Sequence, residues 1–290
     1  MKHVLITGVD SYIGNSVKEW LSNQQEEYVI DEIDLREDHW YQEDFSRYDT
    51  IFHVAGLAHS DIGNARDEIK QMYYKINRDL TLDVAKKAKE AGVKQFIFMS
   101  SIIVYGESSP IGKTKRITVS TAPNPANFYG DSKWQAELGL EKLRSDGFKI
   151  AIIRPPMIYG KGSKGNYPKL AKLAKKLPLF PKLENERSML HIDNLCAFIR
   201  LMVRNQEDGI FFPQNKTYVT TSDLVKEIAA VHGKKIYLPR LFNPFLRLFS
   251  RRISVINKVF GNLSYDLQMS EYKEDYRIRT LAESIELTEK

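Results

Sequence analysis

The sequence predicts an α/β fold, a doubly wound parallel sheet followed by a smaller C-terminal substrate-binding lobe. Through the first half of the chain, apolar runs of strand length alternate with longer segments of helical periodicity, which is typical of a parallel sheet. The runs are mostly apolar, so we expect helices to cover both faces of the sheet. After about residue 160 this alternation gives way to amphipathic helical segments, which we assign to the lobe.

Five apolar runs are the expected strands, and they cover residues 4–6, 28–34, 50–56, 95–101 and 149–160. Two segments between them have apolar residues at helical spacing, namely residues 13–22 and 66–91. We expect residues 1–160 to form the nucleotide-binding domain, with some later residues returning to its sheet. Residues 161–290 are expected to form most of the lobe, with helices at 168–177, 193–205 and 220–233.

The composition is that of an ordinary globular protein, with 42% hydrophobic and 28% charged residues. A single cysteine, Cys196, excludes an internal disulfide framework, and the six histidines are too scattered to suggest a metal site. The net charge of +6 suits an anionic partner, but no long basic block indicates nucleic acid. The N-terminus leads directly into a strand, and no apolar run has membrane-spanning length. We therefore expect a cytoplasmic protein.

The first strand leads into a turn with glycines and then a helix, in the sequence VLITGVDSYIGNSV (4–17). Gly8 and Gly14 stand where a dinucleotide-binding turn has its first and last glycines, and Ser11 takes the middle position. Such a turn lets the backbone approach a pyrophosphate at the helix N-terminus. The alternative is a plain strand–turn–helix in which Ser11 only caps the helix. The Rossmann-type interpretation places these residues against the cofactor: Gly8, Ser11, Tyr12, Ile13 and Gly14.

The end of the second predicted strand carries an acidic residue at the expected distance from the turn. Asp34 lies twenty residues after Gly14, where a carboxylate binds the adenosine ribose hydroxyls and selects NAD over NADP. Arg36, two residues later, keeps NADP as the alternative cofactor.

A tyrosine and a lysine stand four residues apart in FYGDSKW (128–134). On a helix this spacing puts Tyr129 and Lys133 on the same side, one turn apart. An ammonium group there would hold the pKa of a nearby phenol below its usual value of about 10, so that the phenol exchanges protons with a substrate hydroxyl. The alternative is one face of an ordinary amphipathic helix.

Ordered sequence blocks connect these features. They are TGVDSYIG (7–14), HVAGLAH (53–59), MSSIIVYG (99–106) and YGDSK (129–133), followed by IRPPMIYGKGSKGN (153–166) and RSMLHIDNL (187–195). In this order and at these separations, they resemble the extended short-chain dehydrogenase/reductase family. More narrowly, the chain is similar to the NAD-dependent epimerase/dehydratase branch that contains UDP-glucose 4-epimerases. The resemblance covers roughly the first 200 residues.

The resemblance implies catalytic roles for three residues. Tyr129 would be the acid/base at the sugar hydroxyl, and Lys133 would bind the nicotinamide ribose and lower the pKa of the tyrosine. Ser101 would orient the same substrate oxygen, with the neighbouring Ser100 as the alternative.

The resemblance also implies contacts to the cofactor and to the nucleotide diphosphate. Asn77 would bond the main chain near the site, and His191 and Asp193 would organise structure. Arginine suits a diphosphate because it can bond two oxygens at once. The expected cofactor-binding residues after Asp34 and Arg36 are Asp38, His39, Ala55, Gly56, Ser100, Tyr129, Lys133 and Pro156. The expected substrate-binding residues are Asn166 and Arg187.

The activity that the resemblance implies is a UDP-hexose 4-epimerase that uses bound NAD and pairs as a homodimer through residues 66–91 and 127–145. One alternative is an NAD(P)H-dependent nucleotide-4-keto-6-deoxysugar reductase of surface polysaccharide biosynthesis. Another is a non-catalytic nucleotide-binding sensor, against which the intact Ser101, Tyr129 and Lys133 speak. A 4,6-dehydratase is disfavoured because Ile102 and Ile103 stand where such enzymes carry an Asp-Glu pair.

The C-terminal third departs from the epimerase pattern at residues 237–261, which are apolar and basic. Apolar side chains recur there at helical spacing, at Leu241, Phe245, Leu248 and Phe249. Three interpretations remain open at this point. The segment is a lid over the sugar, a helix at a membrane surface, or a helix packed on the lobe with solvated arginines.

Overall fold

The computed structural model describes residues 1–23, 27–58, 66–250 and 254–290. His59, the last residue of the HVAGLAH block, and Arg251 and Arg252 of the basic segment lie outside the described residues. The chain divides into two compact units, each described here by itself. The first comprises residues 1–106, 123–155 and 195–213, and the second comprises 107–122, 156–194 and 214–290.

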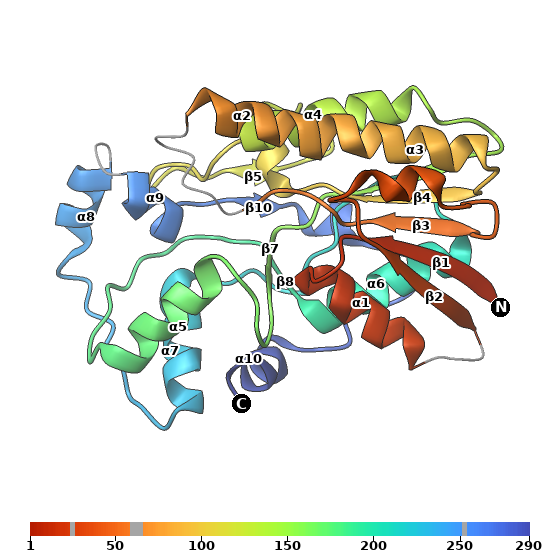
Figure 1. Cartoon of the computed structure of the whole chain (residues 1–290). Helices are drawn as coiled ribbons and strands as arrows, with labels where there is room; N and C mark the ends of the chain where they lie inside the picture. Colours follow the sequence, from red (N-terminus) through yellow and green to blue (C-terminus); the bar gives the residue numbers. More distant parts are fainter. Residues whose placement is uncertain (24–26, 59–65, 251–253) are drawn as a thin grey trace. The chain divides into compact units, whose positions relative to one another are not determined.

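The first unit is built on a six-stranded sheet in which every neighbouring pair is parallel. The strand order is β2-β1-β3-β4-β6-β9. Figure 1 shows the strands of this sheet between layers of helices. The predicted parallel α/β fold is therefore confirmed. The strands are β1 (Lys2–Thr7), β2 (Tyr28–Ile33), β3 (Thr50–His53), β4 (Gln95–Met99), β6 (Lys149–Ile153) and β9 (Gly209–Phe211).

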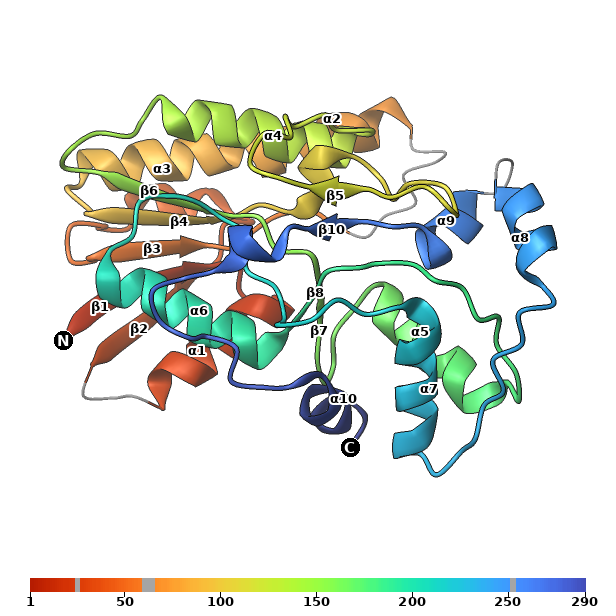
Figure 2. The ribbon, with the colours of Figure 1, turned by 180° about the vertical axis from the view of Figure 1, so that it is seen from behind.

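Helices cover both faces of this sheet, as the continuously apolar strands require. Both views place α3 and α4 on one face and α1 and α6 on the other (Figure 1, Figure 2). The predicted helix 66–91 is interrupted in its middle by a π-helical turn, η3, that carries Asn77. The helices are α1 (Tyr12–Ser22), α2 (Asp67–Tyr74), η3 (Lys75–Leu80), α3 (Thr81–Glu90), α4 (Phe128–Glu141) and α6 (Ile192–Asn205).

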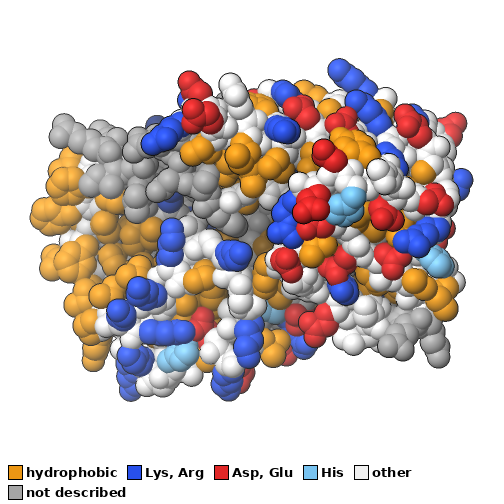
Figure 3. Space-filling model, viewed as in Figure 1, with side chains coloured by type: hydrophobic (Ala, Val, Ile, Leu, Met, Phe, Trp, Pro, Cys, Tyr) orange, Lys and Arg blue, Asp and Glu red, His pale blue; other side chains and the backbone are white. Residues whose placement is uncertain are grey.

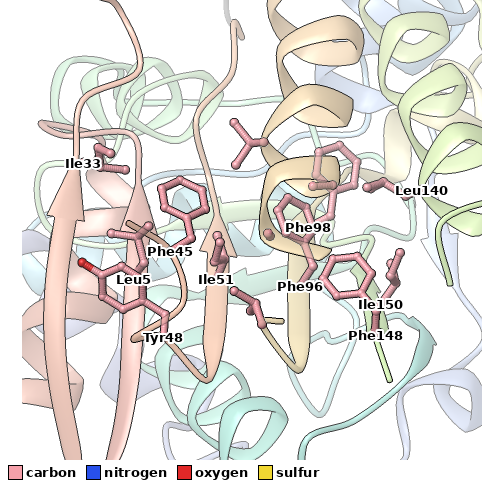
Figure 4. Packing of buried hydrophobic residues seen from close by; sticks show 14 of the residues in the cluster. Leu5, Ile33, Phe45, Tyr48, Ile51, Phe96, Phe98, Leu140, Phe148 and Ile150 are labelled. Atoms are coloured by element: carbon pink, nitrogen blue, oxygen red, sulfur yellow. The ribbon is translucent and has the colours of Figure 1, made fainter. Parts of the chain in front are cut away.

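An aromatic-rich core lies between the sheet and the helices α3 and α4 (Figure 4). Phe96 and Phe98 of β4 are fully buried there. The connection from β2 to β3 contains only the 3₁₀ helix η1 (Asp38–Gln42), and Trp40 and Phe45 of this connection fill the core. Buried aromatic rings thus complete the apolar layer where the crossover is short.

The second unit contains two small parallel pairs, β7 with β8 and β5 with β10. The predicted strand 149–160 is wrong in extent, because Pro155 and Pro156 separate β6 from β7. Proline has no N–H to donate to a sheet, so the run is divided between two sheets. The strands are β5 (Arg116–Ile117), β7 (Met157–Tyr159), β8 (Met189–His191) and β10 (Ser264–Tyr265).

In the second unit, the helices α5, α7 and α10 share one apolar cluster. Thr220 caps α7, as its sequence predicts. None of the helices in the described part of the chain combines the length and the apolar character needed to span a bilayer. The helices are α5 (Asn166–Lys176), α7 (Thr221–Val231), α8 (Asn243–Ser250), α9 (Ser254–Phe260) and α10 (Leu281–Glu289).

Candidate active site

The candidate site of the first unit lies at the carboxyl ends of β1, β3 and β4. The strand order changes direction beside β1, because β2 pairs on one side of β1 and β3 on the other. In open parallel sheets, such a switch point opens a crevice at the carboxyl ends of the strands. The glycine turn follows β1, and Ala55 and Gly56 follow β3.

The glycine turn packs tightly against the loop after β3 at Gly8. Gly8 has φ +92°, and a Cβ there would lie 2.9 Å from the Ala55 nitrogen. A Cβ on Gly14 would lie 2.5 Å from Ser11 Oγ, which accepts a 3.0 Å hydrogen bond from the Gly14 N–H. The predicted capping role of Ser11 is thus confirmed. The turn leads directly into the N-terminus of α1, where a pyrophosphate would be favoured.

The acidic residue after β2 is paired with the arginine that follows it. Asp34 accepts hydrogen bonds from the backbone N–H and from Nε of Arg36, each at 2.9 Å. These hydrogen bonds hold the pKa of Asp34 at about 2. Arg36 also lies 3.6 Å from Asp10, and exposed Asp38 and His39 follow nearby in η1. Asp34 thus lies at the end of β2, where a carboxylate can meet the ribose hydroxyls of NAD.

Tyr129 lies in the first turn of α4, whose N-cap Asn127 accepts a 3.0 Å hydrogen bond from the Gly130 N–H. Its ring packs edge-on against Tyr73, with centroids 5.9 Å apart. Burial raises the pKa of Tyr129 to about 12, and a hydrogen bond with Ser101 opposes that shift. The expectation that this pKa is lowered is therefore wrong for this structure, because loss of hydration outweighs the favourable contacts.

The two consecutive serines after β4 point to different partners. Ser101 caps η4 (Ile102–Tyr105) and hydrogen-bonds with Tyr129. Ser100 is buried, and its hydroxyl donates to the carboxylate of Glu137. The geometry thus places Ser101, rather than Ser100, with the tyrosine.

Lys133 is a buried lysine one turn after Tyr129. Its Nζ donates a 2.9 Å hydrogen bond to the Met99 carbonyl and lies 4.6 Å from the centre of the Phe98 ring. Burial lowers the pKa of Lys133 to about 8, and the Glu137 carboxylate opposes this shift. The ammonium group is held at the carboxyl end of β4, within the predicted cofactor site.

Gly56 leaves room for this lysine. A Cβ at Gly56 would lie 3.1 Å from Lys133 Nζ and 3.0 Å from Asn77 Oδ1. Buried Asn77 accepts a 2.7 Å hydrogen bond from the Leu57 N–H, and its Nδ2 donates to Ser132 Oγ at 3.1 Å. The predicted main-chain bond of Asn77 is confirmed, and it joins the loop after β3 to α4.

A buried network of charged side chains next to Lys133 was not predicted from the sequence. Arg154 Nε donates to both carboxylate oxygens of Glu137, at 3.2 and 3.1 Å, and Nη1 donates to the Tyr105 hydroxyl at 2.5 Å. Burial raises the pKa of Glu137, while Arg154, Ser100 and Lys133 oppose that shift. Tyr129, Lys133 and Glu137 follow one another at intervals of four, which is the signal that could have revealed this network.

The predicted substrate residues lie in the second unit. Asn166 is exposed and begins α5. Arg187 Nη1 donates to the Lys258 carbonyl at 2.7 Å, near the end of α9, and burial lowers its pKa to about 10. Pro156, a predicted cofactor-binding residue, also belongs to this unit and is buried directly before β7. The structure thus places these three residues on separate elements.

His191 and Asp193 also belong to the second unit. The His191 N–H donates to Asn215 at 3.0 Å, and Asp193 accepts a 2.8 Å hydrogen bond from Arg279 Nε. These bonds link the end of β8 and the start of α6 to later parts of the unit.

Replacing Lys133 with methionine is expected to stabilise the fold while abolishing activity. The pKa of about 8 lies below the ordinary 10.5, so the folded state is penalised for holding the proton at pH 7. We expect the variant to be more stable there by about 1–3 kcal/mol, after loss of the hydrogen bond to Met99. As pH rises from about 8 to 10.5, only the unfolded state keeps the Lys133 proton, so the stability of wild type should increase. The stability difference between the methionine variant and wild type should therefore become smaller over this range.

Urea unfolding of both proteins at a series of pH values measures this difference. Lys86→Met, at an exposed lysine of α3, is the matched control and should change stability little at any pH. A methionine variant that is less stable than wild type at pH 7 would contradict the expected penalty.

Comparisons of the sequence with a protein-family model and with known proteins give matches to epimerases and their family. The family model described as "NAD dependent epimerase/dehydratase family" matches residues 4–212. A UDP-glucose 4-epimerase of Vibrio cholerae is 27% identical over 92% of this chain and 88% of its own length. An Escherichia coli O157:H7 protein named N-acetyl-alpha-D-glucosaminyl-diphospho-ditrans,octacis-undecaprenol 4-epimerase is 26% identical, over 89% and 81% of the two chains.

Solved structures share the fold. The UDP-glucose 4-epimerase of Thermus thermophilus in complex with NAD superposes with a TM-score of 0.73, at 19% identity, and covers 99% of this chain and 97% of its own. A dTDP-4-dehydrorhamnose reductase of Clostridium acetobutylicum superposes with a TM-score of 0.65, at 17% identity, with 82% of each chain covered.

Proposed function

We propose, from the premise that this chain belongs to the NAD-dependent epimerase/dehydratase family, that it is a nucleotide-sugar 4-epimerase acting through bound NAD. The observation that carries the proposal is the group at the end of β4. Tyr129 hydrogen-bonds with Ser101 there, and the buried Lys133 lies one helical turn further along α4. Position 4 of the sugar follows from the names of the two curated relatives.

The proposed cofactor site fits a dinucleotide. Gly8 and Gly14 allow the close-packed turn before α1 at which a pyrophosphate would bind, and Asp34 offers its carboxylate to ribose hydroxyls. Ala55 and Gly56 line the loop against Lys133. A nicotinamide held there supplies the acceptor and the donor of hydride.

Tyr129 is the proposed proton donor and acceptor at the sugar oxygen. With a pKa of about 12 its phenol stays protonated at neutral pH, which suits donation to the oxygen as a carbonyl is reduced. Ser101 holds the phenol by its hydrogen bond and is positioned to share the same oxygen. The reverse step requires Tyr129 to accept the proton of the sugar hydroxyl.

The proposed substrate is a hexose linked through a diphosphate, with UDP as the carrier. The Vibrio cholerae relative is named for UDP-glucose, and the Escherichia coli relative for a sugar on a polyprenyl diphosphate. A diphosphate-linked hexose is common to both. Asn166 and Arg187 of the second unit remain the proposed diphosphate ligands, by resemblance.

We also propose a cytoplasmic homodimer. The proposed pairing helices carry exposed apolar side chains, Ile69 and Met72 on α2 and Leu138 on α4. The sequence has a single cysteine, Cys196, which suits a reducing cytosol. Light scattering of the purified protein tests this assembly, and a monomeric mass would contradict it.

Identification of the dinucleotide released on denaturing the freshly purified protein tests the function. We expect stoichiometric NAD, because an epimerase returns its hydride within one cycle. Interconversion of UDP-glucose and UDP-galactose, with and without N-acetyl groups, then identifies the sugar. An empty protein that binds added NADPH or NADH would favour the 4-keto reductase, whose fold is also among the neighbours. Failure to bind any dinucleotide would refute the assignment of the site.

A further inference from the structure

The positive charge of the chain is concentrated in one stretch of the second unit. Between Glu227 and Asp266 the sequence has seven Lys or Arg and no Asp or Glu. The whole chain has 43 basic and 37 acidic residues, so the remainder has 36 against 37. The net charge of +6 is therefore +7 from this stretch and −1 from everything else. Arg251 and Arg252, two of the seven, lie outside the described residues and carry no part of the structural argument.

The same stretch exposes a large apolar surface. We call Tyr237, Leu241, Phe245, Leu248 and Phe249 the α8 patch, and their exposed fractions range from 48% to 76%. Figure 3 shows hydrophobic side chains gathered on the side where Figure 1 places α8. Contiguous apolar surface of this kind marks an interaction site.

The segment is anchored to its own unit by other residues, so the α8 patch is not a loosely packed helix. Leu246 packs against the apolar cluster of the second unit, together with Leu238 and Val259. Ser250 at the end of α8 is buried, with 2% of its surface exposed. The helix thus has one apolar side facing its unit and another facing solvent, which the interpretation as a packed helix with solvated arginines leaves unexplained.

Charged side chains accompany the α8 patch. Arg240 and Arg247 lie between residues of the α8 patch in the sequence and are exposed, as is Lys258 of the neighbouring helix α9. Arg240 lies 3.0 Å from Glu184, but both side chains are largely exposed and such a pair contributes little. Arginines beside exposed Phe and Leu form the pattern of a helix that lies in the interface of an anionic bilayer.

We propose that the α8 patch and its flanking cations dock the protein on the surface of an anionic phospholipid bilayer. A second copy of this chain fits less well, because pairing two α8 patches would bring two sets of unbalanced cations together. Anionic headgroups satisfy both features, since acyl chains accept the apolar side chains and phosphates accept the arginines. The proposal does not rest on the proposed function, because docking requires no turnover.

Co-sedimentation of the full chain with vesicles tests the proposal. We expect binding to mixed phosphatidylcholine and phosphatidylglycerol vesicles, weaker binding to phosphatidylcholine alone, and a loss of binding as salt is raised. Phe245→Glu/Leu248→Glu should reduce the bound fraction on the order of tenfold or more. Arg240→Gln/Arg247→Gln, which keeps the apolar surface, should weaken binding to anionic vesicles on the order of tenfold.

Ile278→Glu/Leu287→Glu, at exposed apolar residues of the same unit outside the α8 patch, is the matched control and should bind like wild type. Circular dichroism and urea unfolding verify that each variant is folded. If the glutamate variant does not fold, binding by the arginine variant tests the proposal instead. The proposal is overturned if wild type binds no vesicles, or if both α8 variants bind as well as the control. It is also overturned if neither wild type nor the glutamate variant binds vesicles and light scattering shows that the glutamate variant dissociates an oligomer. The α8 patch would then be a contact between copies of this chain.

Discussion

Tyr129→Phe is expected to lower turnover by roughly a hundred- to ten-thousandfold while dinucleotide binding is retained. The change removes only the hydroxyl that exchanges the proton, and the edge-on packing of the ring against Tyr73 is kept. Steady-state rates of sugar interconversion and the content of bound dinucleotide measure the two effects separately.

Tyr74→Phe is the matched control, because it also removes one phenol hydroxyl close to α4. The Tyr74 hydroxyl donates a 2.7 Å hydrogen bond to Asp131, outside the proposed proton path, so the rate should change only a few-fold. Full activity in Tyr129→Phe would exclude this residue as the acid. A loss of dinucleotide in the same variant would mean that Tyr129 acts in binding rather than in proton transfer.

Glu137→Gln is expected to destabilise the fold by about 3–5 kcal/mol, a large part of the stability of a typical domain. The substitution keeps the shape of the side chain but leaves the buried guanidinium of Arg154 without its carboxylate. The side chains of Arg154 and Glu137 are 4% and 1% exposed, so water compensates little. Urea unfolding at pH 7 measures the change.

A double-mutant cycle separates the pair from its surroundings. Glu137→Leu combined with Arg154→Met should cost far less than the sum of the single changes, because neither member of the pair is left buried without the other. Glu141→Gln, one turn further along α4, is the matched control, since its partner Arg144 lies in a partly exposed pair and the cost should stay below about 1 kcal/mol. Additive single changes would show that the Arg154–Glu137 pair is not coupled.

The network also bears on the site, because the Glu137 carboxylate raises the pKa of Lys133 against burial. Removing that charge should therefore leave the lysine less protonated at neutral pH. Glu137 is in this sense a positioning residue, which acts on the site through Lys133 rather than by touching the substrate.

Much of the fold could be predicted from local patterns. Apolar runs at β1, β3 and β4 indicated a parallel sheet, because strands covered on both faces are largely apolar. The edge strand β2 departs from this pattern at Asp31 and Glu32. Short pieces escaped prediction, among them β9, whose three residues carry too little pattern and gain their pairing from β6. Pro155 and Pro156 end β6, although the apolar run continues beyond them.

The sequence by itself determined the parallel α/β fold, the glycine turn and the tyrosine–lysine spacing, since each depends on residues close together in the chain. Only the tertiary structure decided which serine lies against Tyr129. The Ser100 hydroxyl instead donates a hydrogen bond to Glu137, which is 37 residues further along the chain. It also showed that burial raises the pKa of Tyr129, and that α8 presents its aromatic residues to solvent. Burial and long-range pairing depend on which segments the fold brings together, and periodicity along the chain does not encode that.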